Sequence, residues 1–204
     1  TGDEVAFVDD DEVGLRQVRR QTRVALHGVV EALGVDRREF ASISAGRAFE
    51  VMLRRNLVTG ATTVVRRSIV DRALPVPEGW IHDEWIAIVA SALGRTAVVR
   101  EPLVDYRQHG GNVVGANDGA GARLASLGRM LRGEHRGWSR QNLAALERCA
   151  PLLAPDKRRV LAEFRRLVQG GPAARLSAMR RGGFYRQGGL SQAALWAAAA
   201  LGRV

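Results

Sequence analysis

Three short clusters of polar residues have the types and spacing needed to hold or activate a polar ligand. They span residues 56–62, 82–85 and 106–112. The first joins Asn56 and Thr59 to Gly60, whose missing side chain lets the backbone approach a sugar closely. The same residues also suit a plain turn between a helix and a strand. The cluster is therefore either a binding loop or a structural turn.

The second cluster, His82-Asp83-Glu84-Trp85, places two adjacent carboxylates at the predicted start of a helix. The helix dipole and the free backbone N–H groups stabilise a carboxylate there, and Asp is a favoured N-cap residue. Asp83 can equally act as a general base that takes the proton of an attacking hydroxyl. The two roles are compatible, because a cap also fixes the geometry of a base.

The third cluster places His109 on a Gly-rich turn beside Arg107, Gln108 and Asn112. Together these guanidinium, amide and imidazole groups can bind a pyrophosphate or a metal ion. A hydrogen-bonded turn would use the same residues and bind nothing.

The hydrophobic pattern predicts the elements that position these clusters. A helix is expected over residues 82–93 with Gly94 at its C-cap. Clustered β-branched residues predict a strand over residues 60–65, and a further strand is expected over residues 96–99. Later in the chain, helices are expected over residues 124–131, 141–153, 155–168 and 190–201. We therefore expect an α/β domain over residues 1–117 and a helical extension over residues 118–204.

Charge also divides the chain. The chain has 31 Lys/Arg and 21 Asp/Glu. The part from Gly119 to Val204 holds 16 of the basic residues and 4 of the acidic ones, which gives it a net charge of +12. The remainder holds 15 basic and 17 acidic residues, a net charge of −2. The cationic part fits docking on anionic lipid at the inner membrane face, or a solvated Arg-rich surface. Nucleic-acid binding is disfavoured, because no recognised motif accompanies the charge.

The remaining bulk features exclude several classes of protein. No run of about 18 apolar residues predicts a membrane span. The single Cys149 excludes an internal disulfide and a cysteine metal cluster, and it fits a reducing cytoplasm. We expect a cytoplasmic protein, with a peripheral contact to the inner face of the cell membrane.

Together, in this order and spacing, the polar clusters resemble a known family. The resemblance covers residues 31–115 and rests on the runs Asn56-Leu57-Val58-Thr59-Gly60-Ala61-Thr62, His82-Asp83-Glu84-Trp85 and Tyr106-Arg107-Gln108-His109-Gly110-Gly111-Asn112. These runs are similar to the second half of family 2 glycosyltransferases, in the bacterial branch that includes rhamnosyltransferases of surface polysaccharides. The resemblance implies a partial GT-A fold, a Rossmann-like mixed sheet flanked by helices.

The resemblance also implies a reaction and roles for individual residues. The reaction is inverting transfer of a sugar from a nucleotide-sugar donor to a polysaccharide or lipid-linked acceptor. Asp83 matches the position of the catalytic base, and His109 matches a position that touches the metal or the diphosphate in some relatives. The pocket for donor or acceptor would be lined by Asn56, Thr59, Gly60, Glu84, Arg107, Gln108 and Asn112.

A metal ion is expected because the family carries an Asp-X-Asp motif after a strand. The apolar run before Asp9 and Asp11 is similar to that motif, and oxygen ligands suit Mg²⁺ or Mn²⁺. A rival alignment matches these acids to the end of the following strand and places the metal motif upstream of Thr1. On either alignment no part of the chain is similar to the nucleotide-binding first half.

Three hypotheses of function follow. The first is a metal-dependent glycosyltransferase of cell-envelope polysaccharide synthesis, with a nucleotide-sugar donor and a glycan or lipid-linked acceptor as its partners. The second is a non-catalytic remnant that binds nucleotide sugar or carbohydrate. The third, supported only by the charge, is a basic protein that binds nucleic acid.

Overall fold

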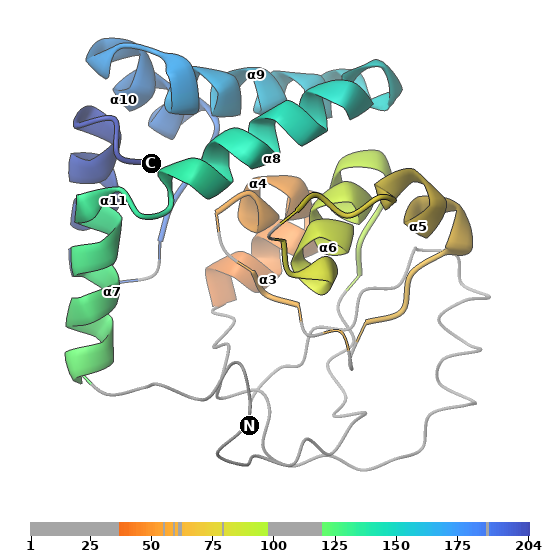
Figure 1. The fold of residues 1–204 in the computed structure, drawn as a ribbon, viewed down its shortest axis with the longest axis horizontal. Coiled ribbons are helices and arrows are strands. Elements are labelled where there is room, and N and C mark those ends of the chain that lie inside the picture. Colours follow the sequence, from red (N-terminus) through yellow and green to blue (C-terminus); the bar gives the residue numbers. More distant parts are fainter. Residues whose placement is uncertain are drawn as a thin grey trace. The chain divides into compact units, whose positions relative to one another are not determined.

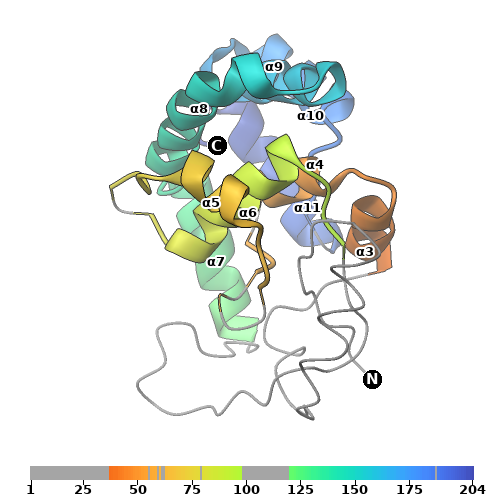
Figure 2. The same ribbon diagram turned by 90° about the vertical axis from the view of Figure 1, so that its right-hand side faces the viewer.

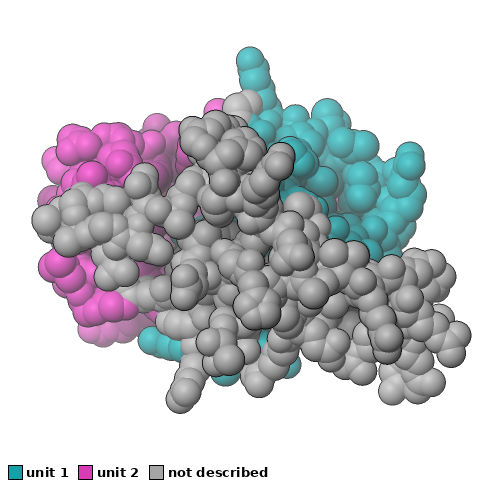
Figure 3. Space-filling view, turned by 90° about the horizontal axis from the view of Figure 1, so that it is seen from below, with its two compact units in different colours: residues 1–117 teal, residues 118–204 magenta. Residues whose placement is uncertain are grey.

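The computed structural model describes residues 37–54, 56–58, 60, 63–78, 80–97, 120–186 and 188–204. The chain divides into two compact units, Thr1–Asn117 (unit 1) and Asp118–Val204 (unit 2), which Figure 3 shows in different colours. Each unit is considered by itself. Among the described helices, none combines the length and the apolar character that a membrane span requires.

The described part of unit 1 consists of four helices, of which one is central. They are α3 (Arg37–Ser44), α4 (Ala48–Met52), α5 (Arg67–Ala73) and α6 (His82–Leu93). Helix α6 packs against both α4 and α5, and α3 packs against α4 (Figure 1). Because α6 is apolar on nearly all sides, from Trp85 to Ala92, it forms the core of this unit.

Trp85 fixes the start of α6 against the end of α5. Its side chain is 2% exposed, and its Nε1–H donates to the backbone oxygen of Ala73, 2.7 Å away. The ring of Trp80 lies 6.0 Å from that of Trp85 at an interplanar angle of 48°. The indole thus donates a hydrogen bond to a carbonyl at the C-terminus of α5, where the last carbonyls of a helix have no N–H partner within the helix. It also anchors the first turn of α6, which carries Asp83.

The described residues correct the predicted fold class. Every regular element in them is a helix, so this part of the protein is all-α and is not the mixed sheet expected for a partial GT-A fold. Residues 63–65, expected to lie in a strand, have no regular structure, and Ala97 forms a single isolated bridge. β-Branched residues favour strands only where a neighbouring strand pairs with them, so their clustering did not suffice here.

Unit 2 is a helical bundle that closes on itself. Its elements are α7 (Ala120–Arg132), α8 (Arg136–Cys149), the short 3₁₀ helix η2 (Ala150–Leu152), α9 (Pro155–Gln169), α10 (Pro172–Arg181) and α11 (Gly189–Ala200). Along the chain α8 packs on α9, α9 on α10 and α10 on α11. Helix α11 then returns to pack beside α7 (Figures 1 and 2).

Apolar side chains on the inner faces of these helices form the core of unit 2. Leu143 and Leu146 of α8 are each at most 1% exposed, and Phe164 of α9 meets Phe184 edge to face with ring centroids 6.0 Å apart. Phe184 lies in the segment between α10 and α11, so this ring pair joins the connecting segment to α9. Such aromatic pairs stabilise a core beyond the area that they bury.

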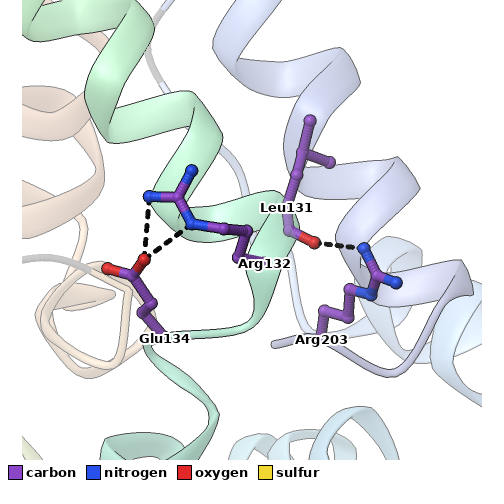
Figure 4. Close-up of polar contacts among 4 residues, drawn as sticks. All are labelled: Leu131, Arg132, Glu134 and Arg203. Carbon is purple, nitrogen blue, oxygen red and sulfur yellow. Dashed lines mark hydrogen bonds and ion pairs between the residues drawn. The ribbon is translucent and has the colours of Figure 1, made fainter.

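The C-terminal residues of unit 2 bind back to α7. Figure 4 shows the guanidinium of Arg203 donating through Nη1 to the backbone oxygen of Leu131, one of the last carbonyls of α7. Gly202 adopts φ +67°, and a Cβ placed there would lie 2.5 Å from Nη1 of Arg175. Glycine is therefore favoured by the backbone conformation, whereas the guanidinium of Arg175, at the end of a flexible side chain, could move aside. The contact explains how a residue 72 positions later caps α7.

Helix α10 is the element that the sequence pattern did not predict. It starts at Pro172 after Gly170 and Gly171, and ends before Gly182 and Gly183. No helix was predicted between residues 168 and 190, because glycine and proline also interrupt helices. Proline at the first helical position and glycine just past the end are ordinary helix boundaries, so the same residues mark a separate helix.

Candidate functional site

A hydrogen bond joins two of the three polar clusters. The carboxylate of Asp83 accepts at Oδ2 from the backbone N–H of Gly60, 2.9 Å away and 23 residues earlier. Oδ1 accepts from the backbone N–H of Glu84 at 2.8 Å. The side chain of Asp83 is half-buried and held from two sides. An ionised carboxylate has about four acceptor positions, so roughly two remain to accept a proton or a hydroxyl.

Asp83 is not the N-cap of its helix. The N-cap of α6 is Ile81, which makes no side-chain capping bond, and Asp83 is the second helical residue. Its carboxylate still lies in the first turn, where the helix dipole favours negative charge. The structural role of Asp83 is therefore to tie the Gly60 loop to α6, and not to cap the helix as expected.

The carboxyl group of Glu84 holds its proton to a higher pH than an ordinary glutamate does. Burial of its carboxyl group, together with the neighbouring charge of Asp83, raises the pKa of Glu84 to about 7. Desolvation disfavours the charged form, and a second negative charge next to it adds to that effect. Near neutral pH the carboxyl group of Glu84 is therefore present in both its protonated and its charged form.

Asn56 supports the loop that leads to Gly60. Its Oδ1 accepts from the backbone N–H of Val58 at 2.8 Å, the local bond of an Asx turn. Val58 and Leu57 are each 2% exposed, so the loop is anchored by their burial. Asn56 therefore shapes the turn that presents Gly60, which is the structural alternative considered for this residue.

His82 is the residue of this site that sequence reasoning missed. A Cβ added at Gly60 would lie 3.5 Å from Nε2 of His82 and 3.6 Å from Oδ2 of Asp83. The exposed imidazole therefore borders the same small space as the carboxylate. Its position next to Asp83 in the chain was the available signal.

The remaining predicted site residues lie outside the described part of the chain. These are Thr59 of the first cluster, the whole third cluster and the proposed metal motif, namely Arg107, Gln108, His109, Asn112, Asp9 and Asp11. Their roles stay predictions.

The described residues do not build a metal site. Within the described ranges no three His, Cys, Asp or Glu side chains come together as ligands. Asp83 and Glu84 are a poor start for one, because Asp83 already accepts two backbone bonds and Glu84 retains its proton up to about neutral pH. A Mg²⁺ or Mn²⁺ ion, if used, would need the oxygen ligands predicted elsewhere.

Comparison with known protein families, with curated proteins and with solved structures finds no match for this chain. The similarity to family 2 glycosyltransferases therefore rests on the residues quoted above.

Proposed function

We propose that this chain carries the acceptor-activating part of a glycosyltransferase, with Asp83 as the general base. The observation that supports this most directly is the bond between Gly60 and Asp83, because it brings together two clusters that the resemblance assigns to one site. Half-burial also suits a base, since a carboxylate removed from bulk water interacts more strongly with the groups beside it.

The chemistry asked of Asp83 is a single proton transfer. The acceptor hydroxyl gives its proton to a carboxylate oxygen of Asp83, and the hydroxyl oxygen forms the new bond to the anomeric carbon. The bond from that carbon to the diphosphate breaks, and the nucleoside diphosphate leaves with the electron pair. A hydroxyl is a poor nucleophile unless its proton is removed, so a positioned base contributes roughly 100- to 10,000-fold to the rate.

Glu84 and Gly60 take supporting roles in this proposal. In its protonated form, which a pKa of about 7 leaves well populated near neutral pH, Glu84 donates a hydrogen bond to a sugar hydroxyl. Gly60 keeps the space in front of the carboxylate open: a methyl group there would make only ordinary contacts with the protein but would occupy that space. Gly60→Ala should therefore fold normally and transfer sugar more slowly.

Asp83→Asn tests the proposal. The chain is incubated with a panel of radiolabelled nucleotide sugars and a membrane fraction that supplies lipid-linked glycan acceptors, and label in the acceptor fraction is counted. We expect transfer to fall roughly 100- to 10,000-fold in Asp83→Asn, with donor binding little changed. Asp71→Asn is the matched control, because Asp71 is an exposed acid whose salt bridge to Arg67 contributes little.

The outcomes separate the two leading hypotheses. Transfer by Asp83→Asn at the rate of the unmodified chain would overturn the role of Asp83. A thermal shift with one nucleotide sugar, accompanied by no transfer from any donor, would favour the non-catalytic binding remnant. That screen is run with and without Mn²⁺, so that it also reports whether donor binding needs the metal.

A further inference from the structure

The described carboxylates of unit 2 are all bound to basic side chains of the same unit. The sequence of the unit holds 16 Lys/Arg and 5 Asp/Glu, one of which, Asp118, lies outside the described residues. The other four form the ion pairs Glu134–Arg132, Glu147–Arg165, Asp156–Lys157 and Glu163–Arg166. A large excess of arginine charge therefore remains on a unit of fewer than ninety residues.

Part of this excess forms a regular row along α8. Arg136, Arg140 and Arg148 follow one another at intervals of four and eight residues, with Ala144 between the last two, and all four residues are exposed. Residues four apart are neighbours on a helix, so the three arginines form an inclined row that rises about 18 Å along α8 and turns about 120° around its axis. We call these three residues the α8 arginine row. Glu147, the one acid of α8, is neutralised by Arg165 of α9.

The row leads to an exposed apolar side chain. Leu152, four residues beyond Arg148, lies in η2 at the turn between α8 and α9 and is 58% exposed. The next residue, Leu153, is buried and accepts at its backbone oxygen from Nε of Arg158, 2.7 Å away. This bond holds a further guanidinium group at the same turn. Leu152 is thus an apolar tip beside two arginines.

We propose that the α8 arginine row and Leu152 dock unit 2 on an anionic phospholipid bilayer. Guanidinium groups bind lipid phosphates through paired hydrogen bonds, and a row without unpaired acids complements a negative surface. An aliphatic side chain gains free energy in the boundary between headgroups and acyl chains. It gains nothing from a phosphodiester backbone, and binding of single-stranded nucleic acid relies on aromatic stacking instead. This inference does not depend on the proposed sugar transfer.

Vesicle sedimentation tests the electrostatic part. The full chain is mixed with vesicles of phosphatidylcholine alone, or of phosphatidylcholine and phosphatidylglycerol in equal parts, and the bound fraction is measured after centrifugation. We expect binding only to the anionic vesicles. Arg140→Gln with Arg148→Gln should weaken it roughly 30-fold, from the usual contribution of each arginine at such a surface.

The matched control removes the same charge elsewhere on unit 2. Arg180→Gln with Arg181→Gln changes two exposed arginines in the last turn of α10. At physiological ionic strength charges more than about 8 Å from the surface are largely screened, so this variant should bind nearly as the unmodified chain does. Equal weakening by both pairs would overturn the assignment to α8, because it would indicate attraction by net charge alone.

Leu152→Ser tests the apolar part and separates lipid from nucleic acid. Because Leu152 is exposed, the substitution should leave the helical circular dichroism unchanged and still weaken binding to anionic vesicles several-fold. The same proteins are titrated with duplex and single-stranded DNA at the same salt concentration. DNA binding as tight as vesicle binding, with no effect of Leu152→Ser on either, would overturn the proposal in favour of a nucleic-acid surface.

Discussion

The carboxylates at the start of α6 in unit 1 and the described carboxylates of unit 2 are held in opposite ways. At the start of α6 in unit 1, Asp83 accepts two backbone N–H groups and Glu84 retains its proton to about pH 7. In unit 2 each described carboxylate binds a Lys or Arg side chain. Charge–charge pairs on a surface contribute little to stability, whereas backbone bonds position a carboxylate without neutralising it. The first arrangement suits chemistry, and the second leaves a cationic surface.

The largest change in stability is predicted for loss of the Trp85 side chain, which supports the site in unit 1. Trp85→Ala deletes a buried indole and its bond to Ala73, so the free energy of unfolding of unit 1 should fall by about 3–5 kcal/mol. Urea unfolding combined with hydrogen-exchange mass spectrometry would locate the loss. Trp138→Ala, which removes a half-exposed indole from unit 2, is the control and should leave the stability of unit 1 unchanged.

Amide protection should therefore be lost in α5 and α6 of the Trp85 variant and kept in α8 and α9. Equal losses in both units would contradict the view that each unit is supported by its own core.

A second, smaller effect concerns pH. Since folding raises the pKa of Glu84 from 4.5 to about 7, the native state binds a proton that the unfolded chain releases within this range. The free energy of unfolding should accordingly fall as pH rises from about 4.5 to 7, by about 2 kcal/mol after allowing for partial exposure. Glu84→Gln should remove this dependence in urea titrations at several pH values.

Glu78→Gln, at an exposed position, should leave the same pH profile unchanged. A profile that kept its full slope in Glu84→Gln would show that another group carries the dependence.

The smallest change in stability is predicted for the contact between the C-terminal residues and α7 in unit 2. Arg203→Ala removes the donor to Leu131 and should lower the stability of unit 2 by about 1 kcal/mol. Arg203→Lys should recover part of this loss, because a lysine keeps the charge without the planar guanidinium. Thermal unfolding would measure both, with Arg181→Ala as an exposed control. Identical melting temperatures for Arg203→Ala and the unmodified chain would show that the contact adds no stability.

The sequence predicted helices better than it predicted contacts. The bounds of α6 were predicted correctly, residues 82–93, because its long apolar pattern ends at Gly94. Helix α9 was predicted to within one residue, since Pro155 starts it and its apolar face is regular. The strand over residues 60–65 was wrong, because β propensity has no effect without a pairing partner.

The site was only partly accessible to the same reasoning. The cluster around Asp83 was recognisable from residue types, but the hydrogen bond to Gly60 spans 23 residues and depends on how α6 packs. The raised pKa of Glu84 likewise follows from burial, which residue spacing does not encode. In unit 2 the pair Glu163–Arg166 follows from its spacing on one helix, whereas Glu147–Arg165 needs the packing of α8 on α9.

The two indoles beside the site have an optical consequence. Trp80 and Trp85 lie with ring centroids 6.0 Å apart and planes tilted by 48°, close enough for their electronic transitions to couple. Coupled, tilted chromophores give a pair of circular dichroism bands of opposite sign, so unit 1 should carry such a signature in the indole region. Its intensity would follow the geometry around the first turn of α6 in solution, without any label.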